Sequence, residues 1–412
     1  MKKTFKLAIV AAIAATSFTS CSDREDDRTV TPDVESNLVE EAGVKWAGLT
    51  GEDNATGVGE LNGDNLPAWA EGWAVAESYA GTTVDAADIQ DAKDNNRVLN
   101  GTYSESVTIN AGEVWVLEGA VHFKAGTTLT IGEGAIIVDE RDPDSENTEA
   151  AQQAVGYILF EQDAKIMAEG TAANPIVFTS TKQETGAWGG LILNGRAPIN
   201  VGETAQAEVS GTTYGGSNVA DNSGTLKYVR VEFTGNIISS EKEHNGITFN
   251  GVGNGTVVEY VQAFKGADDG FEFFGGMVEA NYMISTGSGD DSFDWTYGWS
   301  GKGTNWIGVQ SADAGDRGIE ADNNSNNNAL EPFSNPTLEN ITLIGRNAEG
   351  KSGVKFREGT KANVKNLYVM NFETALDVQH DVTLENVIDG DLTIDTFKAV
   401  SASTVFKFKG DE

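Results

Sequence analysis

Short apolar runs separated by glycines fill the chain from Val107 onward. Most runs are three or four residues long and rich in β-branched residues, which is typical of strands. A glycine recurs about every six to eight residues, and this spacing indicates strand–turn–strand windings. The runs that we expect to form strands are 114–117, 121–123, 129–131, 135–138, 156–160, 164–167, 175–178 and 190–193.

Two columns of residue pairs repeat at longer intervals, mostly 20 to 26 residues, which is the length of one coil of a solenoid. In the first column a polar residue precedes an apolar one, and each pair is expected to open a strand: Lys227-Tyr228, Glu259-Tyr260, Asn281-Tyr282, Asn305-Trp306, Asn340-Ile341, Asn366-Leu367 and Asn386-Val387. In the second column a small residue admits a bend and the next residue points inward. Its members are Gly246-Ile247, Gly270-Phe271, Ser292-Phe293, Gly318-Ile319, Gly353-Val354 and Ala375-Leu376.

These columns predict an all-β fold, a single-stranded right-handed parallel β-helix (solenoid) over residues 106–412. A β-sandwich or jelly roll remains an alternative, because Asn-Gly pairs such as 245–246 and 250–251 are typical of hairpin turns. A propeller is not favoured, since its repeats are longer, roughly 40 to 50 residues.

Residues 41–105 lack this pattern, and we expect them to form an N-terminal cap region. A cap would protect the first coil, whose exposed edge could otherwise pair with another chain. Two short helices are expected there. One runs from Pro67 to Tyr79 with Trp69 and Trp73 on one face, and the other covers residues 85–93.

The chain begins with a pattern typical of an export signal. A basic start precedes an apolar run at 7–15, which is too short to span a bilayer. Cys21 is the only cysteine, so no disulfide can form within the chain. The small residue before Cys21 resembles the bacterial lipobox, which implies a lipoprotein signal peptide over residues 1–20 and lipidation of Cys21. An ordinary signal peptide cut nearby is the alternative.

Residues 21–40 are expected to form a flexible acidic tether, because charge-dense segments without apolar residues cannot pack. Within them, residues 22–28 read Ser-Asp-Arg-Glu-Asp-Asp-Arg. This stretch resembles the acidic tag that sends lipoproteins of the Bacteroidota to the outer face of the outer membrane. The resemblance implies a lipid-anchored protein that faces the cell exterior.

The formal net charge of -35 narrows the choice of partners. Such a surface repels nucleic acid and anionic membranes, and it suits divalent cations, neutral glycans or basic partners. Solubility alone is an alternative explanation of the charge. Zinc is not expected, because His122, His244 and His380 are far apart in the sequence.

One acidic pattern is written twice along the second column. Residues 266–272 read Gly-Ala-Asp-Asp-Gly-Phe-Glu, and residues 288–294 read Ser-Gly-Asp-Asp-Ser-Phe-Asp. Strands on adjacent coils lie about 4.8 Å apart, and carboxylates at that spacing raise one another's pKa unless a cation lies among them. Alignment with the next coil gives three columns: Asp268, Asp290, Asp316; Asp269, Asp291, Arg317; and Glu272, Asp294, Glu320.

Three interpretations of this ladder remain open. In the first, oxygen ligands converge from two coils on Ca²⁺, which takes six to eight oxygens. In the second, Asp side chains cap backbone N–H groups in the turns. The third is catalysis. Under the first interpretation the expected ligands are Asp268, Asp269, Asp290, Asp291 and Asp294.

The catalytic interpretation rests on a resemblance. An Asp-Asp-Gly-Phe run followed by an acidic residue is similar to the calcium site of some pectate-lyase-like polysaccharide lyases. This resemblance implies calcium-dependent elimination on acidic glycans, in which a Lys or Arg abstracts the α-proton. Arg317 is then the expected base. Inverting glycosidase chemistry with two carboxylates is also open.

Aromatic residues crowd the same stretch of sequence. Trp295, Tyr297 and Trp299 would share one face of a strand, because strand side chains alternate with period two. If that face is exterior, the three rings form a stacking platform for glycans. Packing beneath the loop at 323–328 is the alternative.

Residues 105–345 contain several short motifs. Among them are Asn-Pro-Ile-Val-Phe at 174–178, Trp-Gly-Gly-Leu at 188–191 and Tyr-Val-Arg-Val-Glu-Phe at 228–233. Together they resemble the β-helix surface lipoproteins of Bacteroidota, which are often encoded beside TonB-dependent outer-membrane receptors. The resemblance implies a non-catalytic binding or accessory subunit that captures a glycan or docks onto an outer-membrane transporter or assembly complex. A calcium-dependent polysaccharide lyase is the alternative.

Overall fold

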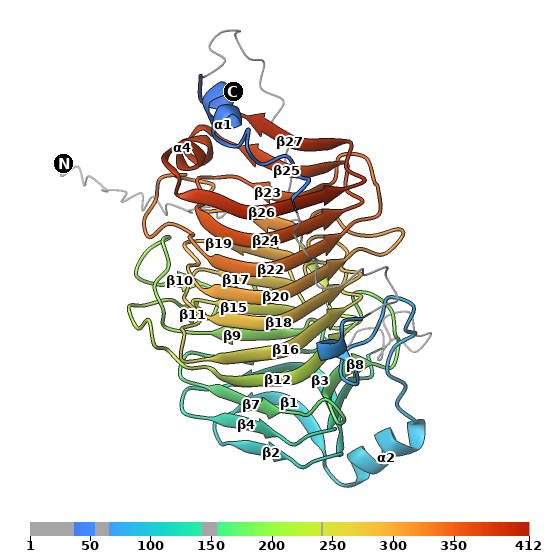
Figure 1. The fold of residues 1–412 in the computed structure, drawn as a ribbon. Helices are drawn as coiled ribbons and strands as arrows, with labels where there is room; N and C mark the ends of the chain where they lie inside the picture. Colours follow the sequence, from blue (N-terminus) through green and yellow to red (C-terminus); the bar gives the residue numbers. More distant parts are fainter. Residues whose placement is uncertain (1–36, 54–65, 142–154, 240–241, 412) are drawn as a thin grey trace, which may run out of the picture.

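The computed structural model describes residues 37–53, 66–141, 155–239 and 242–411. Within these ranges, a 23-stranded sheet winds into a right-handed parallel β-helix (Figure 1). Every strand pairing inside this sheet is parallel. The predicted β-helix is therefore confirmed, and the β-sandwich alternative, whose strands pair antiparallel, is wrong.

Three stacks of strands, which we call faces A, B and C, surround the core. Face A consists of β2 (Val107–Ile109), β4 (Thr128–Ile131), β7 (Lys165–Glu169) and the first halves of seven long strands. These long strands are β12 (Gly224–Glu232), β16 (Val257–Phe264), β18 (Glu279–Thr286), β20 (Lys302–Val309), β22 (Thr337–Ile344), β24 (Ala362–Met370) and β26 (Leu392–Val400).

Face B continues along the second halves of the same long strands. Before them it contains the first halves of β1 (Val98–Tyr103) and β3 (Val114–Phe123), then β5 (Ile136–Asp139) and β8 (Ile176–Ser180). The β-helix therefore begins at Val98, eight residues before the predicted boundary.

Face C starts with the second halves of β1 and β3 and carries the candidate site. It continues through β6 (Tyr157–Phe160), β9 (Leu191–Asn194), β15 (Ile247–Asn250), β17 (Phe271–Phe274), β19 (Phe293–Thr296), β21 (Ile319–Ala321), β23 (Ser352–Phe356), β25 (Thr374–Gln379) and β27 (Thr404–Lys409). Two small hairpins lie outside the β-helix: β10 (Ala205–Gln206) with β11 (Thr213–Tyr214), and β13 (Ile237–Ser239) with β14 (Lys242–Glu243).

Each long strand bends between face A and face B at a residue with positive φ. The φ angle is 57° at Tyr260, 58° at Tyr282, 59° at Asn305 and 61° at Asn340. Asparagine tolerates this left-handed region because its short polar side chain bonds locally. The rings of Tyr260 and Tyr282 stack with centroids 4.4 Å apart, which favours two tyrosines at neighbouring corners.

The first predicted column therefore marks a corner inside a strand and not the start of a strand. Its register is also corrected by one residue, because Asn281 pairs with Thr304 and Met283 with Trp306, which puts Asn305 opposite Tyr282. The final pair, Asn386-Val387, lies in helix α4 (Asp381–Asp389) instead of a strand.

The core is built from similar side chains stacked on successive turns. Phe249 and Phe273 have ring centroids 5.0 Å apart, and Phe271 and Phe293 are 5.6 Å apart with nearly parallel planes. Each fully buried ring contributes about 1.5–3 kcal/mol through removal of apolar surface from water. The second predicted column is confirmed by the pairings Ile247–Phe271–Phe293–Ile319–Val354–Leu376.

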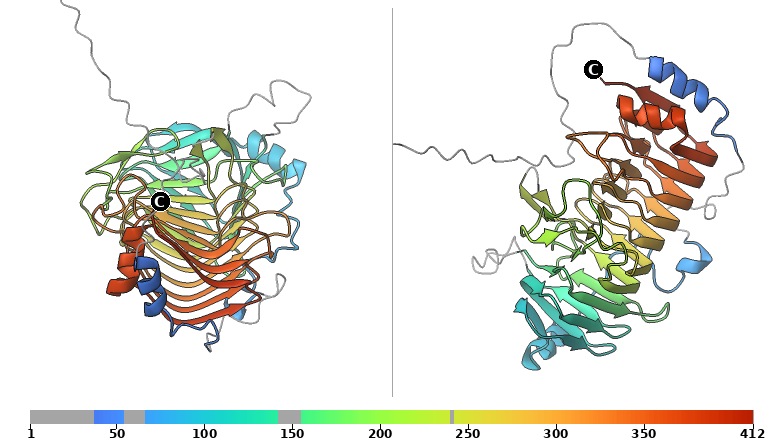
Figure 2. Two further views of the ribbon diagram at one scale, coloured as in Figure 1. Left: turned by 90° about the horizontal axis from the view of Figure 1, so that it is seen from above. Right: turned by 90° about the vertical axis from the view of Figure 1, so that its left-hand side faces the viewer.

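Helix α1 (Asn37–Lys45) closes the C-terminal end of the β-helix, far from the first turn (Figures 1 and 2). Trp46 follows α1 and contacts the rings of Phe356, Phe406 and Phe408 in the last turns. The Lys45 Nζ donates a hydrogen bond to a backbone carbonyl of α4 at 3.0 Å. The predicted placement of this segment as a cap on the first coil is therefore wrong, because its apolar residues fit the opposite end.

Residues 66–94 run along the outside of face B. Trp73 packs edge-on against Tyr228 and Tyr260. Gln262 receives the backbone N–H of Val75 and donates to its carbonyl, at 2.8 and 2.7 Å. The helix expected from Pro67 to Tyr79 shortens to the 3-10 turn Ala68–Ala70.

Helix α2 (Ala86–Asp94) confirms the second short helix. Its Ala92 packs with Val116 and Val138 on the outer side of β3 and β5. In the part of the chain that the structure describes, no helix is long and apolar enough to cross a membrane.

Candidate cation-binding site

The two acidic copies lie on adjacent turns of face C. Phe271 pairs with Phe293 and Glu272 with Asp294, as the alignment predicted. The backbone N–H of Asp316 donates to the carbonyl of Asp290 at 2.8 Å, so the third coil continues the stack. We call the carboxylates of these three turns the acidic column: Asp268, Asp269, Glu272, Asp290, Asp291, Asp294, Asp316 and Glu320.

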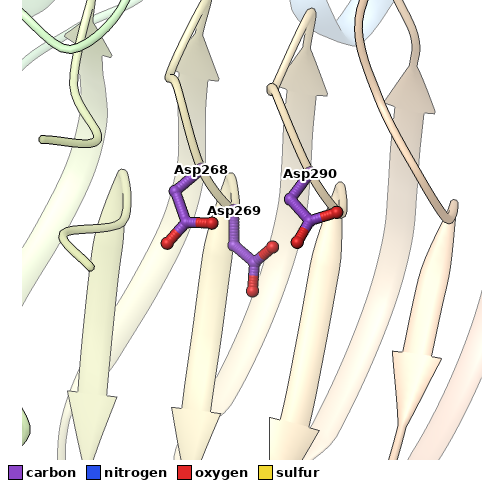
Figure 3. A group of neighbouring side chains, drawn as sticks. All are labelled: Asp268, Asp269 and Asp290. Atoms are coloured by element: carbon purple, nitrogen blue, oxygen red, sulfur yellow. The ribbon is translucent and has the colours of Figure 1, made fainter. Parts of the chain in front are cut away.

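Four overlapping groups of three carboxylates form within the described residues. In each group, one oxygen per residue lies within 4.8 Å of the others. Figure 3 shows Asp268 and Asp269 on one turn and Asp290 on the next, with their carboxylates on the same side of the strands. The four groups are Asp268–Asp269–Asp290, Asp269–Glu272–Asp294, Asp290–Asp291–Asp316 and Asp291–Asp294–Glu320.

One oxygen of two aspartates serves the backbone of the following turn. Asp269 Oδ1 accepts a hydrogen bond from the Asp291 N–H at 2.8 Å, and Asp291 Oδ1 accepts one from the Arg317 N–H at 2.5 Å. The turn-capping interpretation therefore holds for these oxygens. It does not account for the carboxylates of Glu272 and Asp294, which belong to the same acidic column.

The column points out of the β-helix, yet most of it is buried. Asp294 is only 2% exposed, and Asp269, Glu272 and Asp291 are also buried. The β10–β11 hairpin packs against face C: Thr212 accepts a hydrogen bond from the Asn194 side chain of β9 at 2.7 Å, Ala207 and Tyr214 pack with Phe274 of β17, and Figure 1 shows the hairpin beside face C. The hairpin thus lies against the turns of β9 and β17, next to the buried carboxylates.

Burial and mutual repulsion raise the pKa values of these carboxyls. Burial is the largest cause of the raised pKa of Asp269, followed by the charges of Asp268, Asp291 and Asp294. Burial also leads for the raised pKa of Glu272, where the Asn245 hydrogen bond acts in the opposite direction. Holding these carboxyls in their charged form at neutral pH is costly unless a cation balances them.

Basic side chains balance the column at its upper end. Arg317 pairs with Asp316, and Lys351 Nζ lies 2.6 Å from the same carboxylate. Lys355 and Arg357 pair with Glu320, whose pKa burial raises to about 7 against the opposing effect of these bases. The negative charge therefore concentrates at the turns of β17 and β19.

Two buried oxygens at the lower end have no hydrogen-bond partner among the described residues. They are Oδ1 of Asp294 and Oδ1 of Asn245, and the two residues are 2% and 3% exposed. The other end of the Asn245 amide donates to Glu272 and to Thr248. An all-oxygen set of this kind fits a hard cation such as Ca²⁺. Sequence reasoning missed Asn245, although it directly precedes the Gly246-Ile247 pair of the second column and so aligns with Asp269 on the next turn.

A family model for a pectate-lyase-like β-helix domain matches residues 101–411. The chain belongs to this pectate-lyase-like β-helix family. No curated protein and no solved structure gave a match.

Arg317 of this pectate-lyase-like β-helix lies on the predicted turn beside Asp290 and Asp291. The residue is 5% exposed, and its guanidinium pairs with Asp316 and lies 3.9 Å from Glu320. A buried, ion-paired guanidinium serves as a counter-charge for the acidic column. A free base for proton abstraction needs access to substrate, which this position does not offer.

The predicted glycan platform is corrected by the structure. Trp295 and Trp299 are 0% exposed and belong to the core, where Trp299 stacks on Phe273 at 4.3 Å. Tyr297 is only half-buried and lies outside with Phe274, at 5.7 Å. The strand ends at Thr296, so a turn separates Tyr297 from Trp299 and the period-two argument fails.

Cys21, the predicted lipidation site, lies outside the described residues, as do the signal peptide and most of the tether. The metal-competent groups within the described part of the chain consist of carboxylates alone, and none includes His122, His244 or His380.

Proposed function

We propose that this pectate-lyase-like β-helix protein is a non-catalytic binding or accessory subunit, lipid-anchored through Cys21 on the outer face of the outer membrane. It captures a glycan or docks onto an outer-membrane β-barrel, such as a TonB-dependent receptor. Calcium held by Asp268, Asp269, Asp290, Asp291 and Asp294 stabilises the β-helix. The family match supports a glycan-related role.

The enclosure of the acidic column is the observation that carries the non-catalytic role. A catalytic calcium ion must touch the substrate while the bond breaks, so its ligands line an open site. Here Asp269, Glu272, Asp291 and Asp294 are buried, and the β10–β11 hairpin packs against β9 and β17 of the same face. An ion in this position supports folding and stays away from any glycan.

The alternative function is a calcium-dependent polysaccharide lyase acting on acidic glycans, and the pectate-lyase-like family match favours it. Elimination leaves an unsaturated sugar that absorbs ultraviolet light. A panel of polyuronates incubated with the full chain and Ca²⁺ therefore tests it. We expect no increase in absorbance; an increase that Arg317→Ala abolishes while the variant stays folded would replace our proposal with the lyase.

The accessory role is tested by purification from native membranes in detergent, followed by identification of the proteins that come with the chain. We expect an outer-membrane β-barrel at near-stoichiometric amounts. Cys21→Ala is the matched control for anchoring, because it removes the lipid attachment and leaves the β-helix unchanged. Recovery of wild type from the soluble fraction, as for Cys21→Ala, would contradict the anchored role.

A further inference from the structure

The uncompensated charge of the acidic column lies at one place, between β17 and β19. The charges that act most strongly on Asp269 are all negative, whereas Glu320, two turns further along the ladder, has Arg357 and Lys355 beside it. The column changes from acidic to alternating along the stacked positions Glu272, Asp294, Glu320, Lys355, Asp377 and Lys407. The chain thus supplies its own cations at the upper turns.

Buried oxygens point to a ligand at this lower place. Oδ1 of Asp294 and Oδ1 of Asn245 have no hydrogen-bond partner among the described residues, although each residue is more than nine-tenths buried. Both belong to one neighbourhood, because Asn245 Nδ2 donates to Glu272, which stacks on Asp294. A buried oxygen without a hydrogen-bond partner destabilises the fold, and two such oxygens beside carboxylates favour a positive partner.

The β10–β11 hairpin brings one more carboxylate to the same neighbourhood. Ala207 and Tyr214 of the hairpin pack with Phe274, two residues after Glu272, and Val209 packs with Ile192 on a lower turn. Glu208 lies between these anchors. Its charge contributes to the raised pKa of Glu272, which places the two carboxylates close together. Without a cation, their repulsion opposes the docking of the hairpin.

We propose that Asp269, Glu272 and Asp294 share one divalent cation. The amide oxygen of Asn245 and the carboxylate of Glu208 complete its oxygen shell, so that the ion ties the β10–β11 hairpin to β17. This inference rests on the calcium binding in the proposed function. It adds Glu272, Asn245 and Glu208 as ligands, keeps Asp269 and Asp294, and gives the ion a task. Five oxygens from protein groups suit Ca²⁺, which takes six to eight ligands including water.

The test uses hydrogen exchange of residues 205–214 and calorimetric titration with Ca²⁺ on the full chain. In wild type we expect slower exchange of the hairpin with Ca²⁺ than with chelator. Glu208→Gln is expected to weaken Ca²⁺ binding about tenfold or more, because affinity follows the charge of the ligand set. Its hairpin should exchange equally fast in both conditions. Glu203→Gln, at an exposed position just before the hairpin, is the matched control and should behave as wild type.

Thermal unfolding in chelator keeps the test independent of misfolding. Removal of one charge from a repelling group should leave Glu208→Gln at least as stable as wild type without metal. If Ca²⁺ binds and Glu208→Gln binds it as tightly as wild type, with unchanged hairpin protection, this inference is wrong and the calcium proposal stands. If wild type takes up no Ca²⁺ at all, the calcium proposal itself fails.

Discussion

Single carboxyl groups show what burial costs in this protein. Asp139 at the end of β5 is buried, and burial raises the pKa of its carboxyl to about 7. Its Oδ1 accepts only the Arg141 N–H in the hydrogen bonds of the described residues, at 3.0 Å. Asp139 therefore shows in a single residue the rise in pKa on burial that several carboxyls of the acidic column share.

Asp139→Asn tests that effect through pH. The unfolded carboxyl loses its proton near pH 4 and the folded one near pH 7, so wild type loses stability as pH rises between these values. The neutral amide removes the loss. We expect the variant to match wild type near pH 4 and to exceed it at pH 8 by up to about 4 kcal/mol in denaturant unfolding. An equal difference at both pH values would contradict this account.

Asn340 tests the corner between faces A and B. It combines a φ of 61° with hydrogen bonds to Asn305 and Asn366 on the adjacent turns, at 3.3 and 2.7 Å. Asn340→Ala loses both and keeps the strained backbone, so we expect a loss of about 1–2 kcal/mol in urea unfolding. Asn340→Gly relieves the backbone and should cost less. Equal losses for the two variants would show that φ is not the cause.

At this scale the sequence predicts neighbours better than it predicts exposure. The stacking of Asp268 with Asp290 follows from the repeat, because identical spacing puts equivalent residues on adjacent turns. The placement of Tyr297 on a different side from Trp295 does not follow, because a turn after Thr296 breaks the alternation. Asn245 stands at the position of the repeat that Asp269 occupies on the next turn, so its place was predictable. Its hydrogen bond to Glu272 is visible only in the fold.

The elements that close the β-helix belong to distant parts of the chain. Helix α1 and Trp46 cover the last turns, where α4 and β27 form the end of the solenoid (Figure 2). A terminal turn exposes strand edges and apolar rings unless something covers it. This segment therefore protects the end at which the chain finishes.

Trp46→Ala removes the main contact of this cover. Deleting a buried Trp side chain costs about 3–5 kcal/mol, since the cavity left among Phe356, Phe406 and Phe408 refills only in part. We expect α1 to exchange its amide hydrogens faster and to be cleaved sooner by protease. Val44→Ala, at a position that is 70% exposed, is the control and should leave both unchanged. Protection of α1 equal to wild type in Trp46→Ala would refute its role.

Strands were predictable and their covers were not. A strand such as 129–131 is predictable from its own residues, because short β-branched runs are separated by glycine turns. The place of α1 depends on a contact between residue 46 and residues beyond 356, and local pattern carries no information about so distant a partner. For the same reason the helix predicted from Pro67 does not form beyond Ala70. Trp73 packs against Tyr260 of the β-helix instead of lining one face of a longer helix.

At the scale of the whole molecule, the turns of the β-helix are joined by one sheet, which has 23 strands among the described residues. Repulsion between two turns of face C therefore destabilises the neighbouring turns as well. The formal net charge of -35 adds to this electrostatic repulsion. A divalent cation between β17 and β19 would relieve the stack at its most acidic point.

The pH dependence of thermal stability in the absence of metal tests this electrostatic repulsion. Burial and neighbouring acids raise the folded pKa of six carboxyls of the acidic column, for Glu320 to about 7, above the value near 4 of the unfolded chain. The six are Asp268, Asp269, Glu272, Asp291, Asp294 and Glu320. Stability in chelator should therefore be highest near pH 4 and fall as pH rises through 7, because the unfolded state gives up protons first. We expect the midpoint of thermal unfolding in chelator to decrease from pH 5 to pH 8. An increase over this range would contradict the assignment.

The most direct test of the cation site is thermal unfolding of the full chain at pH 8, with excess Ca²⁺ and with chelator. A ligand that binds only the native state stabilises it by about 2.7 kcal/mol at a hundredfold excess over its dissociation constant. The account predicts a higher midpoint with Ca²⁺, and a much smaller rise for Asp294→Asn. Equal midpoints for wild type in the two conditions would contradict it.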